Sequence, residues 1–236
     1  MLYLFPNLLA EHVSHAAFFP VSVDAAVSRI TALIAENEKE GRHFLRRFSF
    51  ESPKTFRDIP IHLLNEHSSE ADKKRLFGWI REGGIWGLVS DCGMPCLADP
   101  GADLVLLCRT QGVAVETFAG PSSILFALVL SGLGGQHFTF HGYLPKEEGE
   151  LLQKLRGIEK LSRQEKSTHL FMETPYRNLK LFEKVVATLD DRTWLGIACS
   201  LTAPDQLVQT RRIGEWKRLP LPAIDKRPAM FILVCN

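Results

Sequence analysis

Short apolar runs alternate with segments of helical periodicity through the first half of this chain. The apolar runs predict strands at residues 2–5, 29–36, 85–90 and 113–118. The helical spacing predicts helices at residues 38–48, 72–82 and 103–111. The run at 85–90 is apolar throughout, which is typical of a parallel strand covered on both faces. Repeated strand–loop–helix units of this length favour a doubly wound, mostly parallel α/β domain.

The pattern changes after residue 118, where strands follow one another with shorter connections. The expected helices cover residues 123–133, 147–162 and 175–189. The expected strands cover residues 138–143, 167–173, 194–201, 207–212 and 229–235. This order predicts a second α/β domain with a mixed sheet, so we expect domains at 1–115 and 116–236.

Composition and charge narrow the class of protein. Hydrophobic residues make up 45% of the 236 residues and the formal net charge is +1, which is ordinary for a globular protein. Such a balance argues against binding to nucleic acid through overall charge, but it leaves room for a local basic patch. The apolar run at 124–133 is about half the ~20 residues needed to span a bilayer, and Pro6 interrupts the run at 2–10. We therefore expect a cytoplasmic protein that is not bound to a membrane.

The cysteines do not form a recognisable framework. There are five, and only Cys92 and Cys96 are close in sequence. No second Cys/His pair lies at zinc-ligand spacing, so no metal site is expected.

The loop SDCGMPCLADPG, residues 90–101, follows the apolar run at 85–90. Ligands of open α/β sheets bind at the carboxyl ends of strands. Gly93 permits a tight turn, Pro95 stiffens the loop, and Asp91 and Asp99 supply acceptors for a cationic or hydroxylated ligand. The alternative is a rigid loop whose aspartates bond to their own backbone.

A second turn, GPSS at residues 120–123, precedes the next helix. A serine here can cap the first turn, and the exposed amide groups attract an anion such as a carboxylate. An N-cap without a ligand is the alternative. Together the two loops suggest a ligand cleft between two domains.

Four segments resemble the tetrapyrrole methylase superfamily in order and spacing: SDCGMPCLADPG, GPSS, FHGYLPKEEGE and FMETPYRN. Within this superfamily, the chain most resembles the branch whose members methylate the 2′ oxygen of a cytidine ribose in small-subunit ribosomal RNA. The chain departs from that branch at Asn37, where the family has Asp, and at Ser200, where it has Glu. It also lacks the glycine of the first loop, after Pro6.

The resemblance implies a homodimer that binds S-adenosylmethionine between its two domains. It assigns the cofactor to residues in both halves of the chain: Pro6, Ser90, Asp91, Cys92, Gly93, Pro95, Ser122, Ser123, Glu173, Thr174 and Thr202. Ribosomal RNA or the small ribosomal subunit is the implied partner.

Methyl transfer to a ribose hydroxyl needs orientation and a base that removes the hydroxyl proton. The candidate bases are Glu36, Glu66, His67 and Glu173. Each has a structural alternative: Glu36 could pair with Arg42, His67 could be a surface residue, and Glu173 could anchor the turn at Pro175.

A basic cluster is the candidate substrate surface. The helical spacing places Arg42, Arg46 and Arg47 on one face, where they could contact phosphates; the alternative is a solvated face paired with nearby glutamates. Arg177 could face the substrate or hold the preceding strand.

Three functions remain open on these residues. The first is a ribosomal RNA ribose methyltransferase that uses S-adenosylmethionine. The second is a methyltransferase for a tetrapyrrole or another small molecule. The third is a protein that binds S-adenosylmethionine or RNA without catalysis, which the losses at Asn37 and Ser200 would favour.

Overall fold

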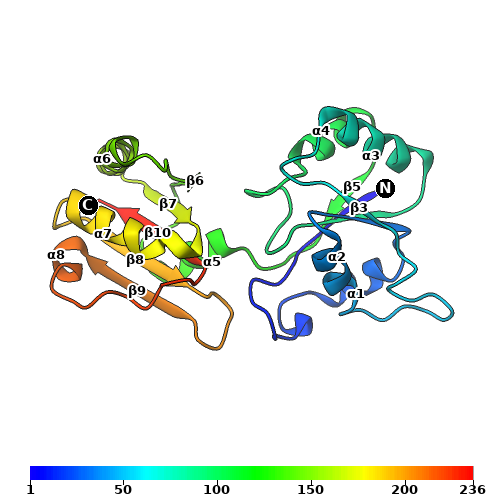
Figure 1. The fold of residues 1–236 in the computed structure, drawn as a ribbon, viewed down its shortest axis with the longest axis horizontal. Coiled ribbons are helices and arrows are strands. Elements are labelled where there is room, and N and C mark those ends of the chain that lie inside the picture. The colour runs from blue at the N-terminus through cyan, green and yellow to red at the C-terminus, as the bar shows by residue number, and fades with distance from the viewer. Residues whose placement is uncertain (236) are drawn as a thin grey trace. The chain divides into compact units, whose positions relative to one another are not determined.

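The computed structural model describes residues 1–235 and consists of two compact units, Met1–Ser122 and a second unit that begins at Ser123 (Figure 1). The division lies seven residues after the expected boundary at 115/116. The reason is that Val115–Thr117, strand β5, pairs in parallel with the first strand of the chain and so belongs to the first sheet.

The first unit contains a five-stranded parallel sheet in the order β3-β2-β4-β1-β5. Its strands are β1 Leu2–Phe5, β2 Ala32–Ala35, β3 Ile61–Leu63, β4 Trp86–Val89 and β5 Val115–Thr117. Every residue of β2 and β4 is buried, as expected where helices cover both faces of a parallel sheet. The doubly wound fold class predicted from the sequence is confirmed.

Helices cover both faces of this sheet (Figure 1). Helices α1 (Val21–Val27) and α2 (Glu38–Leu45) share one apolar cluster with Phe5 and Leu33. Helices α3 (Glu70–Glu82) and α4 (Ala102–Thr110) share the other with Leu2, Ile34 and Leu88. Alternate side chains along each strand therefore supply two separate cores.

Three elements of this unit were not expected from the sequence: α1, the short 3-10 turn η1 (His15–Ala17) and the edge strand β3. Helix α1 has two turns only, and η1 has no buried residue. The strand β3 is three residues long and Leu63 is 50% exposed, so it carries no apolar run. Pairing with β2 makes it a strand.

The second unit contains a mixed sheet in the order β6-β7-β10-β8-β9. Its strands are β6 Phe138–Tyr143, β7 Thr168–Glu173, β8 Trp194–Cys199, β9 Leu207–Arg212 and β10 Ala229–Val234. The β6–β7 pair is parallel and the other three pairs are antiparallel. The expected mixed sheet is confirmed.

Helices α6 (Glu148–Glu165), α7 (Asn178–Thr188) and α8 (Ile213–Trp216) pack into one apolar cluster with the inner residues of β7, β8 and β10. Helix α5 (Ser123–Ser131) contacts β8, β9 and β10, and the 3-10 turn η2 (Pro175–Arg177) leads into α7. The four-residue α8 is too short for its periodicity to be visible in the sequence. Within residues 1–235, no helix is both long and apolar enough to cross a membrane.

The topology gathers loops at one edge of each sheet. In the first unit all strands are parallel, so the segments that follow β1, β2, β3, β4 and β5 begin at the same edge. In the second unit Glu173 at the end of β7 and Cys199 at the end of β8 are both register partners of Ala229. The loops after β7 and β8 therefore flank the start of β10.

Candidate active site

Asn7 joins the loops after β1 and β4, and the sequence pattern did not reveal it. Its side chain is buried, and Nδ2 donates to the carbonyl oxygens of Ser90 (2.9 Å) and Asp91 (3.0 Å). Its Oδ1 accepts from Leu8 N (2.9 Å) and from Arg47 Nη1 (2.7 Å). Asn7 therefore fixes the path of the 90–93 loop through its hydrogen bonds to the backbone of Ser90 and Asp91.

Gly93 completes this junction. Its backbone forms a two-way bridge with Asn7, with N–O distances of 2.7 and 3.2 Å. Its φ of +73° is a conformation that glycine adopts without strain. Pro95 is buried two residues further on, so the predicted tight turn and stiff loop are both present.

Pro6 and the GPSS turn pack closely together in the same unit. A Cβ atom at Gly120 would overlap the Pro6 ring, so only glycine allows this approach. Ser122 is buried at the end of the first unit, and Ser123 begins α5 in the second.

Three acidic residues, Glu36, Asp91 and Asp99, lie in the segments that follow β2 and β4. We call this cluster the carboxylate group. Glu36 Oε1 accepts from the backbone N of Asp91 at 3.0 Å. Asn37 Nδ2 donates to both carboxylate oxygens of Asp91, at 3.1 and 3.2 Å. Asn37 also caps α2 by accepting from Glu40 N at 2.8 Å. The amide that replaces the family's Asp at position 37 therefore supplies a donor that a carboxylate would lack.

Burial makes this group reluctant to ionise. It raises the pKa of Glu36, of Asp91 and of Asp99, the last to about 6, and the negative charge of Glu36 raises the Asp99 pKa further. The pKa of the Cys92 thiol rises to about 11 through burial and the charges of Asp99, Asp91 and Glu36. A cation or a set of hydroxyl donors would relieve this repulsion.

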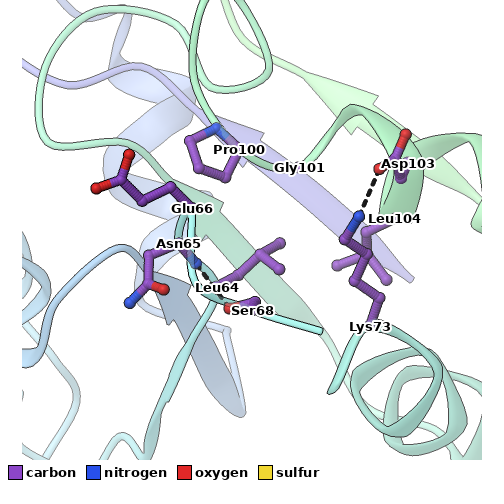
Figure 2. A pocket seen from close by; sticks show the side chains of 9 residues that line it. All are labelled: Leu64, Asn65, Glu66, Ser68, Lys73, Pro100, Gly101, Asp103 and Leu104. Atoms are coloured by element: carbon purple, nitrogen blue, oxygen red, sulfur yellow. Dashed lines mark hydrogen bonds and ion pairs between the residues drawn. The ribbon is translucent and has the colours of Figure 1, made fainter. Parts of the chain in front are cut away.

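A cavity of about 210 Å³ lies beside the same edge (Figure 2). Asn65 and Glu66 line it from the segment after β3, and Pro100 and Gly101 line it from the end of the 90–101 loop. Lys73 closes it from α3, with Nζ 2.6 Å from Asp103 Oδ2 and 2.7 Å from Glu70 Oε1. Asn65 Nδ2 donates to the carbonyl of Glu36 at 3.1 Å, which ties the cavity wall to the carboxylate group.

The four candidate bases lie in different surroundings. Glu36 is half-buried within the carboxylate group. Glu66 and His67 lie next to each other at the surface, with His67 Nε2 3.6 Å from Glu66 Oε1 and side chains 84% and 85% exposed, and Glu66 lines the cavity. Glu173 lies in the second unit, at the end of β7.

Glu173 has the anchoring contacts that its structural alternative describes. It is buried, its Oε1 accepts from Thr174 N at 2.7 Å, and Arg177 Nη2 lies 3.1 Å from its Oε2. These contacts hold the turn that leads into η2. Arg177 thus has a partner within its own turn.

The loop after β8 is strained and contains an orphaned polar atom. Ser200 and Thr202 have φ values of +48° and +69°, which non-glycine residues seldom adopt. Thr202 Oγ1 is buried without a hydrogen-bond partner among the described residues. Arg227 holds this loop by donating from Nε to Ser200 Oγ at 3.1 Å. Strain and an unpaired buried hydroxyl are typical of ligand sites.

The three arginines of the predicted basic face diverge. Arg42 Nη1 donates to the carbonyls of Phe56 (2.9 Å) and Ile59 (2.7 Å), so it fastens the 56–59 loop. Arg47 is partly buried and bonds to Asn7. Only Arg46 is exposed. The expectation of one shared face is wrong, because α2 ends at Leu45 and Arg47 lies beyond the helix.

The chain is similar to proteins that modify ribosomal RNA. No family model matches it. It is 32% identical over 155 residues to ribosomal RNA small subunit methyltransferase I of Escherichia coli O157:H7, covering 66% of this chain and 53% of the relative. It is 30% identical over 189 residues to the protein of the same name from Vibrio cholerae, covering 80% of this chain and 62% of the relative. The match thus spans just over half the length of these relatives.

Solved structures share the fold across nearly the whole chain. The methyltransferase CobJ superposes with a TM-score of 0.63 at 15% identity, covering 98% of this chain and 92% of that one. A uroporphyrin-III C-methyl transferase from Thermus thermophilus, complexed with S-adenosyl homocysteine, gives 0.56 at 15% identity, covering 99% and 96%. The chain belongs to the family of the ribosomal RNA small subunit methyltransferase I proteins, the family of the predicted resemblance, and it shares the fold of these solved methyltransferases.

Proposed function

We propose that the chain is an S-adenosylmethionine-dependent methyltransferase whose acceptor is a ribose hydroxyl of small-subunit ribosomal RNA. One observation carries the cofactor assignment: the carboxylates of Glu36, Asp91 and Asp99, of which Glu36 and Asp99 are partly buried, gather at the carboxyl edge of the parallel sheet. The names of the sequence relatives support the RNA acceptor.

The residues present fit this cofactor. It carries a sulfonium charge, an ammonium group and ribose hydroxyls, and the carboxylate group offers acceptors for all three. We assign Ser90, Asp91 and Gly93 to direct contact, with Pro6 and Pro95 shaping the loop around them. In the second unit the unpaired Thr202 hydroxyl supports the assignment of Thr202. Ser122, Ser123, Thr174 and Cys92 are assigned on the resemblance.

When bound, the cofactor supplies an electrophilic methyl group that is transferred by in-line displacement. The protein must then align the acceptor, an effect worth roughly 7–11 kcal/mol in favourable cases. The cavity bounded by Glu66 and Pro100 is a suitable place for the acceptor nucleotide, because Pro100 and Gly101 belong to the same loop as Ser90–Gly93.

Among the candidate bases we assign proton removal to Glu66. It lines the cavity, and its exposed carboxylate is free to move toward a bound hydroxyl. Glu36 instead holds the cofactor loop through the Asp91 amide. Glu66→Gln should lower the turnover rate and leave cofactor affinity unchanged, whereas Glu36→Ala, which removes the acceptor for the Asp91 amide, should weaken cofactor binding.

Methyl transfer itself decides between the open functions. Ribosomal RNA from a strain that lacks the gene should accept labelled methyl groups, either as naked RNA or within free small subunits. Transfer to uroporphyrinogen but not to RNA would favour the small-molecule alternative, and cofactor binding without transfer to either would favour a non-catalytic protein. The resemblance also leads us to propose a cytoplasmic homodimer, which light scattering tests directly: a mass near 26.5 kDa at micromolar concentration would reject it.

A further inference from the structure

A second hollow, of about 290 Å³, lies next to the first cavity in the same unit. The two share Asn65 and Ser68, so the segment after β3 forms the ridge between them. We call this second space the outer hollow. Its far wall is formed by His62 of β3 and by Arg75 and Trp79 of α3.

Two rings that line the outer hollow, His62 and Trp79, pack against the buried ring of Trp86. The rings of Trp79 and Trp86 lie nearly parallel, with an interplanar angle of 11° and centroids 6.5 Å apart. The His62 ring lies 4.8 Å from Trp79 and 5.1 Å from Trp86. Arg75 Cζ lies 5.7 Å from the centre of the Trp79 ring. Trp86 is buried beneath, whereas Trp79 is only partly covered.

Trp79 packs partly against the apolar core of the first unit and leaves the rest of its side chain at the surface. Trp86 Nε1 donates to the carbonyl of Gly83 at 3.1 Å and is satisfied within the sheet. The Arg75 side chain, by contrast, is 60% exposed and bonds to Asp72 through Nη2 at 2.6 Å. A partly exposed tryptophan beside a guanidinium plane and an imidazole is what a planar, π-rich ligand stacks on.

We propose that the outer hollow holds a nucleobase of single-stranded RNA, next to the nucleotide whose ribose enters the first cavity. The inference rests on the proposed function, which it deepens by adding a flanking base site. The base would stack on the Trp79–Arg75 pair, and the ridge of Asn65 and Ser68 would separate it from the acceptor nucleotide.

The surrounding charges favour a base over a phosphate. Arg75 is paired with Asp72, so this cation at the rim already has an anionic neighbour. Burial and the charge of Arg75 lower the pKa of His62, which favours the neutral form of its ring. Stacking depends little on which base is bound, because every base has a π-face.

The test measures the binding of short oligoribonucleotides in the absence of cofactor, with tryptophan fluorescence as the signal. RNA should quench the emission of the wild-type protein. Trp79→Leu keeps an apolar side chain against Trp86 but removes the stacking face. Loss of one stacked base weakens binding roughly 5- to 140-fold, so we expect a fall in this range and most of the quenching to disappear.

Trp194→Leu is the matched control. Arg212 lies 4.9 Å above Trp194 in the second unit, so this pair has the same chemistry but does not line the outer hollow. Its replacement should leave RNA affinity unchanged. Oligoribonucleotides that are abasic at one position should bind the wild-type protein more weakly, and Trp79→Leu should abolish that difference.

The proposal is overturned if folded Trp79→Leu, judged by its thermal melting curve, binds RNA as tightly as wild type. Arg75→Gln gives a second measurement that perturbs the core less, and it should weaken binding in the same direction. A failure of the proposed function is distinguishable, because in that case S-adenosylhomocysteine binding or methyl transfer fails whatever Trp79 does. Quenching by peptides but not by RNA would assign the outer hollow to a protein partner instead.

Discussion

Replacing Asn7 by alanine should loosen the cofactor loop more than any change to the loop's own side chains. The side chain makes four hydrogen bonds, two donated by Nδ2 and two accepted by Oδ1. Asn7→Ala removes all four while the Ser90 carbonyl stays buried. It also leaves the partly buried Arg47 guanidinium without this acceptor.

The magnitude follows from these contacts. A neutral hydrogen bond contributes about 1 kcal/mol and one to a charged group about 1.5–3 kcal/mol. Three neutral bonds and one to Arg47 therefore give a loss of roughly 3–5 kcal/mol, allowing for water that enters beside Asp91. The 90–93 loop keeps its backbone bridge to residue 7, so the fold should survive with a less ordered loop.

Urea denaturation and calorimetry with S-adenosylhomocysteine measure the two consequences. We expect a lower free energy of unfolding for the first unit and at least a tenfold weaker affinity, since each 1.4 kcal/mol of lost preorganisation costs a factor of ten. Gln111→Ala, an exposed amide in the same unit, is the control and should change stability by no more than about 0.5 kcal/mol. A loss below about 1 kcal/mol in Asn7→Ala, with unchanged affinity, would refute the reasoning.

Four further predictions concern the same unit. Affinity for S-adenosylmethionine should fall as the pH drops through about 6, because protonation of Asp99 removes negative charge from the site. The affinity for S-adenosylhomocysteine, whose thioether is uncharged, should depend less on pH. Asp99→Asn should flatten the pH profile of S-adenosylmethionine affinity. The same raised pKa means that the ionised Asp99 destabilises the fold above about pH 6, so Asp99→Asn should raise the melting temperature at pH 8 but not at pH 4. Arg42→Ala removes the hydrogen bonds to the 56–59 loop and should lower the free energy of unfolding by about 2–3 kcal/mol. Arg46 is exposed, so Arg46→Ala should change that free energy by less than about 0.5 kcal/mol. If Arg46 contacts a phosphate, the same variant should also reduce the salt dependence of RNA binding. Gly93→Val should cost at least about 1–2 kcal/mol through its positive φ, with loss of cofactor binding; equal cofactor affinity in the variant would show that the loop lies outside the site.

The order of elements could be predicted from local pattern, because burial on two faces leaves a direct trace in the sequence. The strands β1 and β4 are runs of apolar residues, and α3 repeats its inner stripe at Leu76 and Ile80. Glycine at 93 and proline at 95 marked a constrained loop, since backbone restrictions act within a few residues. The position of that loop after a parallel strand indicated a ligand site, and the identity of the ligand came from the family resemblance.

Long-range contacts were beyond such reasoning. Asn7 bonds to residues 83 and 84 positions away, and nothing near Asn7 in the chain distinguishes it from a surface asparagine. The same holds for the pKa values of Glu36 and Asp99, which depend on two strands that meet in the sheet. A raised pKa is a property of the folded environment and leaves no pattern in the sequence.

Helix α2 and its arginines show which features follow from the sequence and which depend on the tertiary structure. Helical spacing correctly placed Phe44 and Leu45 on the buried side of α2, because the apolar face of a helix follows from its period. It could not say what each arginine touches, since a long side chain reaches partners outside its own helix. Arg42 extends to the 56–59 loop and Arg47 to Asn7. These partners are decided only by the tertiary packing of segments that are distant in the sequence.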